Sequence, residues 1–514
     1  HNHDRYGKLT FLLPPPRSAP LSISLSPQNM PDDTTHTISC PRREPAATPE
    51  RVFTRDLLRT ATAQLLSWRQ AAGAFGQLHL HACWGESSAL QRRYHGQTIY
   101  GLRHLLPGVI KLHQNTGDPA WRLLADDLAA NILYLQTRDG GFFHASNEFE
   151  PTYTCEESCP IHQGLPVLAL LDYAAWPDAN PLRVEQIKTA IVAWWRWFEG
   201  CWWKRGNAWK RPLAEPGFCG VTNQDLVIVA ALARWSQVFE EHGRAPFENC
   251  GKPVLDRYLK NDYYHEKTGL FERGDSANFA ERSSYCDIIL PMLEIVHAVT
   301  GDGRLPCVID NVAAHLFDAL FDGPDGFTHL SWGAQTDPAD KTRVIGWTRF
   351  PITFSSYPQF VRILKNHARR SRSAAHETAC RRLEETLAAW VFADGTIPVA
   401  LGADPLFAVA GCTGTLWPFL IDRLGPAADL RMDEAAAAVA TLPRVHRSCG
   451  KITWKTNARA WIIERDGRRA FAGLKQNPSA LAIGPDEFLS GSDLSCLSTP
   501  DVHETLSMTI PPVP

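Results

Sequence analysis

The stretch Cys219-Gly-Val-Thr-Asn-Gln-Asp-Leu-Val-Ile-Val-Ala-Ala-Leu-Ala-Arg-Trp235 decides the fold of this chain. After a short polar start, Thr222 to Asp225, it is apolar on nearly every helical face for three turns. A helix that is apolar all round is buried all round. We therefore predict a buried helix over 220–239, and its polar start must be satisfied by capping, by neighbouring groups or by a ligand.

Outward from this stretch, buried helices alternate with amphipathic ones. In 181–203, for example, Val184, Ile187, Ile191, Trp194 and Phe198 recur at spacings of three and four, which predicts one apolar stripe. The other amphipathic helices are expected at 51–72, 119–136, 246–264, 304–321 and 374–392, and the other buried helices at 96–115, 160–175, 282–300, 351–366 and 412–424. Glycine-containing turns follow most of the amphipathic helices.

A unit of one outer helix, one turn and one inner helix, repeated six times, closes most simply into a ring. The pattern resembles the (α/α)6 toroid found in many polysaccharide lyases and glycoside hydrolases and in some isoprenoid enzymes. It covers residues 51–430, so we predict an all-α toroid there. Residues 1–50 are rich in Pro, Ser and Thr and predict an extended lead-in, whereas the short β-rich runs in 445–514 predict a small antiparallel β element.

Composition limits the partners of the protein. The net charge of -3 over 514 residues argues against nucleic acid, and no apolar run reaches the roughly 18 residues of a membrane span. Thirteen cysteines without framework spacing, together with no signal-peptide pattern, lead us to expect reduced thiols and a cytoplasmic location. The sequence does not indicate an oligomeric state.

The starts of the six inner helices should share one rim of the ring, where helix dipoles favour an anionic or hydroxyl-rich ligand. Capping explains some of the polar residues there, such as Thr222 and Asp225. Two tryptophans are candidates because aromatic faces stack on sugar rings. As substrate-binding residues we expect Gln97, Glu156, Gln163, Gln224, Arg282, Asp287, Trp347, Arg349, Tyr357 and Trp417.

These residue types fit β-elimination on an acidic, uronate-containing oligo- or polysaccharide. Such a reaction needs groups that neutralise the sugar carboxylate, a base for the C5 proton and an acid for the leaving oxygen. Asn223 with an arginine would neutralise the carboxylate, His162 would be the base, and a tyrosine would be the acid. The catalytic candidates are His162, Tyr285, Tyr153, Asn223 and Asp225.

Three alternatives stay open. Paired carboxylates among Glu156, Glu157, Asp225 and Asp287 would suit glycoside hydrolysis. The Cys155-Glu156 pair before an inner helix resembles the toroidal linalool dehydratase-isomerases, which implies chemistry on a small isoprenoid alcohol. A toroid that binds a glycan without converting it is the last alternative, although the many titratable groups favour an enzyme.

We expect no cofactor and no metal. Cys155, Cys159 and His162 have a spacing that could supply three zinc ligands, but a zinc site needs a fourth ligand or a bound water, and no CxxC pair supports one.

Overall fold

A computed structural model describes a large part of the chain. The described residues are 48–67, 99–134, 136–142, 160–205, 213–272, 283–322, 327–331, 333–337, 339–340, 342–347, 357–389, 391, 395, 397, 410–442, 451–455, 460–465 and 468–473. The predicted lead-in of residues 1–50 lies outside them except for its last three residues.

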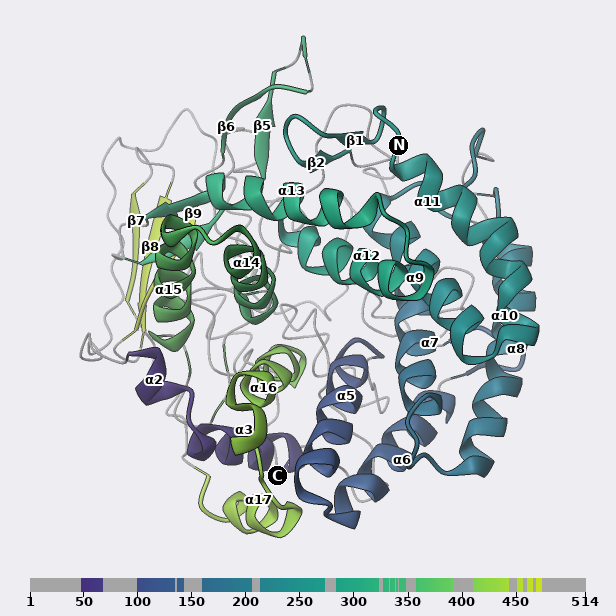
Figure 1. Cartoon of the computed structure of the whole chain (residues 1–514). Helices are drawn as coiled ribbons and strands as arrows, with labels where there is room; N and C mark the ends of the chain where they lie inside the picture. Colours follow the sequence, from purple (N-terminus) through teal and green to yellow (C-terminus); the bar gives the residue numbers. More distant parts are fainter. Residues whose placement is uncertain are drawn as a thin grey trace, which may run out of the picture.

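Six inner helices form a closed ring, and this confirms the predicted toroid (Figure 1). They are α5 (Ile99–Thr116), α7 (Pro160–Ala174), α9 (Thr222–Val238), α12 (Cys286–Thr300), α14 (Tyr357–Ser371) and α16 (Ala410–Leu424). Each contacts the next one along the chain, and α16 returns to contact α5. The apolar stretch that suggested the fold is α9, in which every residue from Leu226 to Ala233 is buried.

Six helical segments surround the ring: α3 (Arg55–Ser67), α6 (Pro119–Tyr134), α8 (Pro181–Trp202), α10 with α11 (Glu240–Pro246 and Lys252–Tyr258), α13 (Leu305–Asp318) and α15 (Ala374–Ala389). The stripe predicted on α8 is confirmed, because Ile187, Ile191, Trp194 and Phe198 are buried. The single helix predicted over 246–264 is wrong. A π-helical turn over Phe247–Gly251 separates two short helices, and the second ends before the strand at Tyr264.

The inner helices run in the same direction. Gly164 in α7 packs so closely on α9 that a Cβ atom there would come within 2.6 Å of Val227 Cγ1. Farther along the same two helices, Asp172 and Arg234 form an ion pair of 3.4 Å. Both pairs join equivalent levels of α7 and α9, so the helices begin at the same end of the ring. We call this end, where the inner helices begin, the N-terminal rim.

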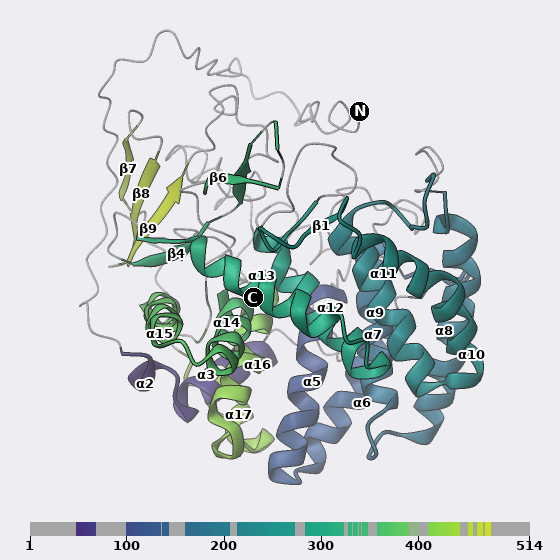
Figure 2. The ribbon, with the colours of Figure 1, turned by 45° about the horizontal axis from the view of Figure 1, so that its top comes forward.

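Short antiparallel hairpins lie at that end: β1 (Tyr264–His265) with β2 (Leu270–Phe271), β3 (Leu320–Asp322) with β4 (Thr328–Leu330), and β5 (Ala334–Thr336) with β6 (Val344–Trp347). They were not predicted. Figure 2 shows these strands gathered at one end of the helices. The predicted C-terminal β element is confirmed as the antiparallel sheet β7 (Lys451–Lys455), β8 (Ala460–Arg465) and β9 (Arg468–Gly473).

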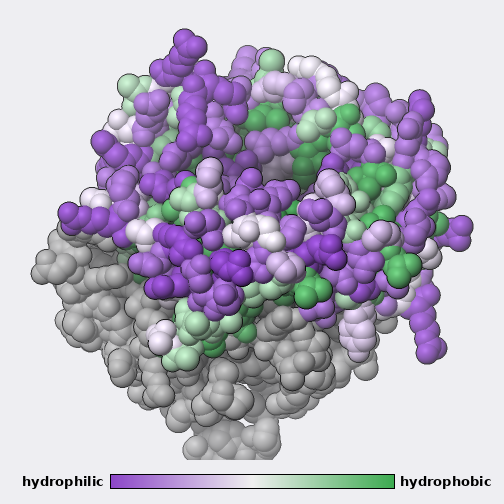
Figure 3. Space-filling view, turned by 60° about the horizontal axis from the view of Figure 1, so that its bottom comes forward, coloured by the Kyte–Doolittle hydropathy of each residue, from purple (hydrophilic) through white to green (hydrophobic). Residues whose placement is uncertain are grey.

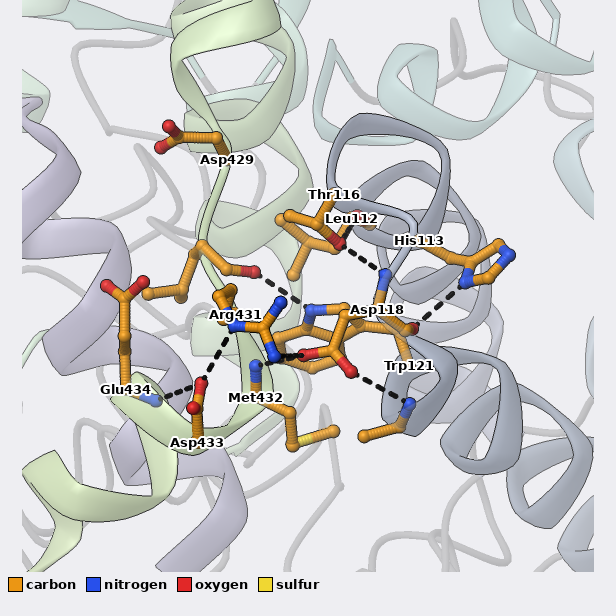
Figure 4. Close-up of polar contacts among 12 residues, drawn as sticks. Leu112, His113, Thr116, Asp118, Trp121, Asp429, Arg431, Met432, Asp433 and Glu434 are labelled. Carbon is orange, nitrogen blue, oxygen red and sulfur yellow. Dashed lines mark hydrogen bonds and ion pairs between the residues drawn. The ribbon is translucent and has the colours of Figure 1, made fainter.

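The opposite rim is joined by the closing seam, which we define as the contacts of residues 425–434 with the α5–α6 corner and with α3. Asn115 donates from Nδ2 to the carbonyls of Gly425 (3.0 Å) and Ala428 (2.9 Å). Asp118 accepts from the backbone N–H groups of Ala120 and Met432, each at 3.0 Å (Figure 4). The ends of the ring, far apart in sequence, are therefore joined by hydrogen bonds.

Two ion pairs and one buried indole complete this seam. Arg55 of α3 pairs with Asp429 (2.6 Å) and Glu434 (2.8 Å), and Trp121 donates from Nε1 to the Leu430 carbonyl at 2.9 Å. The helix α17 (Met432–Val439) follows directly. The described polar groups of this rim are thus largely paired with one another.

The described surface is mostly hydrophilic in the view of Figure 3, with hydrophobic side chains in small groups. Among the described residues, no helix combines the length and the hydrophobicity that a membrane span requires.

Candidate functional site

The start of α9 is not capped by a side chain. Its N-cap residue is Val221, which offers no side-chain acceptor. The Thr222 hydroxyl donates instead to the Glu272 carbonyl, and Glu272 directly follows strand β2. The first backbone N–H groups of a helix have no partner within it. This end of α9 therefore presents the positive end of its dipole without the side-chain acceptor that usually covers it.

Asp225, the acidic residue of this first turn, binds the loop that leads into the helix. Its carboxylate accepts from the backbone N–H groups of Phe218 (3.2 Å), Cys219 (2.8 Å) and Gly220 (3.2 Å), and from the Tyr258 hydroxyl (3.0 Å). Burial raises the pKa of Asp225, and the hydrogen bonds from Cys219 and Phe218 oppose this rise. With no exposed surface, Asp225 fixes the loop that leads into α9.

A second buried layer supports the same loop. Arg257 of α11 donates to the Pro216 carbonyl (3.1 Å) and to the Tyr263 hydroxyl (3.0 Å), and its Nε lies 3.2 Å from the Glu215 carboxylate. Its guanidinium also lies over the Tyr263 ring, 4.6 Å from the centroid. These contacts fix the loop before α9 to helix α11.

Asn223 differs from its neighbours because its polar atoms are not all paired. The residue is 4% exposed, and its Oδ1 atom is buried without a hydrogen-bond partner among the described residues. An unpaired buried polar atom costs roughly 1–3 kcal/mol. Such groups in folded proteins call for an explanation, and a ligand is one of them. Among the predicted residues, Asn223 is the one with the strongest structural signal.

His162 and Gln163 occupy the first turn of α7, beside α9 on the N-terminal rim. His162 is 3% exposed. The Gln163 amide accepts from the Phe142 N–H (2.9 Å) and donates to the Phe142 carbonyl (2.8 Å). Gln163, predicted to bind substrate, thus ties α7 to the segment that follows α6, whereas His162 borders the rim.

Tyr285 and Asp287 lie at the start of α12, the neighbour of α9 on its other side. The helix begins at Cys286, four residues later than predicted, because residues Ser283–Tyr285 form a 3-10 turn. Tyr285 is the N-cap residue of α12, and both it and Asp287 are partly exposed. The N-terminal rim therefore carries a histidine, an amide, a phenol and a carboxylate on three adjacent inner helices.

The structure adds a histidine–carboxylate pair that sequence patterns did not indicate. His265 Nε2 lies 2.8 Å from Glu272 Oε1, and each side chain is only 10% exposed. The pair is formed across the β1–β2 hairpin, seven residues apart, and Glu272 also accepts the bond from Thr222 of α9. A prediction of this hairpin would have placed the two side chains on one face.

The remaining predicted residues occupy different surroundings. Tyr357 is fully buried and its hydroxyl bonds His329 Nδ1 at 3.0 Å. Trp417 is 2% exposed and donates from Nε1 to the Thr62 hydroxyl at 2.8 Å. Gln224 is partly exposed beside Asn223, whereas Trp347 lies in β6 and packs, partly exposed, against the hydrophobic core.

Several predicted residues lie outside the described part of the chain: Gln97, Tyr153, Glu156, Arg282 and Arg349, together with Cys155 and Cys159 of the zinc alternative. Within the described part, no group of three or more His, Cys, Asp or Glu side chains is arranged to hold a metal ion. The absence of a cofactor, the mutual reach of Asn223, His162 and Tyr285, and the isoprenoid alternative based on Cys155-Glu156 stay predictions.

Comparison with known proteins gives structural likeness only. No family model matches the chain, and no curated protein matches it in sequence. The D-mannose isomerase structure aligns with a TM-score of 0.49 and 10% identity, covering 73% of this chain and 99% of that one. Cellobiose 2-epimerase from Bacillus thermoamylovorans aligns with a TM-score of 0.47, 12% identity, and coverage of 71% and 98%. An α-1,6-mannanase variant from Salegentibacter aligns with a TM-score of 0.44 and 13% identity, covering 76% of this chain and 100% of that one.

Proposed function

We propose that this protein is an enzyme that acts on carbohydrates, and that its active site lies on the N-terminal rim around Asn223. The Oδ1 atom of Asn223, buried and without a hydrogen-bond partner among the described residues, carries the proposal. An amide offers a donor and an acceptor, so it can receive a sugar hydroxyl or, with the amide turned, a carboxylate oxygen. Both groups are abundant on acidic sugars.

The uncapped start of α9 favours an anionic substrate. The dipole of α9 attracts negative charge at this end, and the Asp225 carboxylate is bonded to the loop that precedes the helix. Glu272, whose carbonyl accepts from Thr222, has its carboxylate paired with His265. We therefore propose a uronate-containing oligo- or polysaccharide as substrate and β-elimination as the reaction.

In this reaction a base removes the C5 proton of the uronate, the electron pair forms the C4–C5 double bond, and the bond from C4 to the leaving oxygen breaks. His162 would take the proton and Tyr285 would donate one to the leaving oxygen. Asn223 and the start of α9 would stabilise the negative charge that develops on the carboxylate.

Hydrolysis is the second candidate. It needs two carboxyl groups on either side of the glycosidic bond, and Asp287 and Glu272 both belong to segments of the N-terminal rim. The buried pairing of Glu272 with His265 is the observation that favours it. Hydrolysis leaves a new reducing end and no double bond, so the products of the two reactions differ.

The test is to incubate the purified protein with a panel of uronate-containing and neutral polysaccharides. We expect uronate polymers to yield the ultraviolet absorbance of a conjugated unsaturated product, and Asn223→Ala to abolish most of it. Asn115→Ala, the matched asparagine of the opposite rim, is the control. New reducing ends without absorbance would replace elimination by hydrolysis. Neither product from any polymer would overturn the proposed function.

A further inference from the structure

The pair of His265 and Glu272 differs from the other histidine–carboxylate contacts of the described residues. Its Nε2–Oε1 distance is 2.8 Å, whereas the others measure 3.1–3.8 Å. Both side chains are largely buried. A carboxylate at this distance can balance the positive charge of a protonated imidazole with a charge-assisted hydrogen bond. The pair therefore has the composition of a group that exchanges protons.

The β1–β2 hairpin places this pair on one of its two faces. His265 lies opposite Leu270, and Glu272, two residues farther along, lies on the same face. The other face carries Tyr264 and Phe271, whose ring centroids are 5.0 Å apart. Asn311 of outer helix α13 donates to the Tyr264 hydroxyl at 2.7 Å. The face of His265 and Glu272 is thus opposite to the one that contacts α13.

The second ring nitrogen of His265 is left for a ligand. Its Nε2 atom contacts Glu272, and its Nδ1 atom forms no hydrogen bond with a described residue. Nδ1 is also not among the buried, unpaired atoms of the described side chains, so it reaches the surface. The bond to Glu272 fixes the orientation of the ring and selects Nδ1 as the nitrogen that exchanges a proton.

The hairpin also places the pair beside the proposed active site. The Glu272 carbonyl accepts from the hydroxyl of Thr222, the residue before Asn223 in α9. The chain then continues from this hairpin to α12, the next inner helix, whose N-cap residue is Tyr285. The pair is therefore connected to the starts of both inner helices that carry proposed active-site residues.

We propose that His265 is a catalytic residue that gives its Nδ1 proton to the leaving oxygen of the substrate, and that Glu272 is its positioning residue. The inference rests on the proposed function and refines one step of it, the proton donation given there to Tyr285. An imidazolium gives up its proton more readily than a phenol does at neutral pH. Hydrolysis also requires a donor to the leaving oxygen, so the assignment applies to either reaction.

The proton balance of this step is simple. The imidazolium of His265 transfers the Nδ1 proton to the leaving oxygen while the bond from the sugar carbon to that oxygen breaks. His265 is then neutral and keeps its Nε2–H on the Glu272 carboxylate. A proton from water restores the imidazolium before the next turnover, so no further reactant is needed.

The test uses His265→Gln, because a glutamine amide can keep the hydrogen bond to Glu272 but has no acidic proton to give. We measure kcat/KM on the polysaccharide that the wild-type protein converts and on a uronate substrate whose leaving group is 4-nitrophenoxide, which departs without a proton. We expect a loss of about 100-fold on the polysaccharide, the usual contribution of one general acid, and little loss on the nitrophenoxide substrate.

Two further variants accompany this one. Glu272→Gln replaces a charge-assisted hydrogen bond with a neutral one and should lose about tenfold on the polysaccharide only. His242→Gln is the matched control, because His242 and Glu241 form an exposed pair on the outer helix α10. It should match the wild-type protein. Urea denaturation shows that each variant is folded.

The outcomes separate this inference from the proposed function. Equal losses of His265→Gln on both substrates, or no loss on either, would overturn the role of His265 and leave the proposed enzyme. The expected pattern in Tyr285→Phe instead of His265→Gln would return the step to Tyr285. No turnover of any polysaccharide by the wild-type protein would overturn both proposals.

Discussion

Asn115 and Asn223 stand at opposite rims of the same ring, and their amides have opposite surroundings. Asn115 donates to two carbonyls of the closing seam, whereas Oδ1 of Asn223 is buried without a partner among the described residues. If both rims served stability alone, the side-chain amide of Asn223 would be expected to be hydrogen-bonded, as that of Asn115 is. Both rims contain hydrogen bonds that stabilise the fold, but the difference between the two asparagines fits our proposal that Asn223 is kept for a ligand.

The largest expected effect concerns the support beneath the N-terminal rim. Asp225→Ala leaves three backbone N–H groups and the Tyr258 hydroxyl without their acceptor in a fully buried place. We expect the free energy of unfolding to fall by on the order of 4 kcal/mol, since each unpaired buried group costs roughly 1–3 kcal/mol. Urea denaturation measures this. Asp225→Asn keeps one oxygen acceptor and should lose less; equal losses would contradict the proposed support.

The next effect concerns activity. Asn223→Ala should reduce kcat on the substrate by about 100-fold, the usual consequence of losing one group that stabilises transition-state charge. The free energy of unfolding should stay level or rise, because the substitution removes an unpaired buried atom. Steady-state kinetics measures the loss of kcat, and urea denaturation of the same preparation measures the free energy of unfolding. A variant that is destabilised and fully active would reverse our assignment of the two rims.

The matched substitution at the opposite rim should lower stability and leave activity unchanged. Asn115→Ala leaves the carbonyls of Gly425 and Ala428 without their donor. We expect about 1–2 kcal/mol of lost stability, given roughly 1 kcal/mol for each hydrogen bond, and unchanged kcat/KM. Thermal or urea unfolding measures the loss of stability, and steady-state kinetics measures kcat/KM. Loss of activity without loss of stability would show that the seam has a role in catalysis.

The smallest effect is a pH dependence of the closing seam. Burial raises the pKa of Asp118, but the N–H groups of Met432 and Ala120 outweigh it, and Arg431 at 4.0 Å adds to them, so the pKa is lowered overall. A lowered pKa in the folded protein contributes stability that is present above the unfolded value of about 3.9 and is lost as pH falls through the folded value.

Asp118→Asn should therefore weaken the fall in stability below about pH 4, at a cost of about 1 kcal/mol at neutral pH, where one N–H group loses its acceptor. Unfolding curves from neutral to acidic pH compare the two proteins. An identical acid dependence in Asp118→Asn would show that other carboxylates control it.

The helical ring could be predicted because its signal is local. Apolar periodicity gave six inner and six outer segments, and most of the observed helices begin and end within a few residues of the prediction. Two exceptions follow from backbone chemistry: Pro246 and Pro253 interrupt the hydrogen-bond ladder around the π-helical turn, and a 3-10 turn delays the start of α12. A third is α14, which spans Tyr357–Ser371 instead of the predicted 351–366.

What the sequence determined by itself was the alternation of buried and amphipathic helices, and hence that Asn223 would sit at a helix start on one rim. It could not distinguish Asn223 from Asp225, two residues apart, because their partners come from elsewhere in the chain. Only the tertiary structure surrounded Asp225 with donors, left Oδ1 of Asn223 without one in the part of the chain that the structure describes, and brought His265 to Glu272. The physical reason is that burial and hydrogen-bond pairing are properties of the packed neighbours of a residue, whereas periodicity is a property of the residues next to it along the chain.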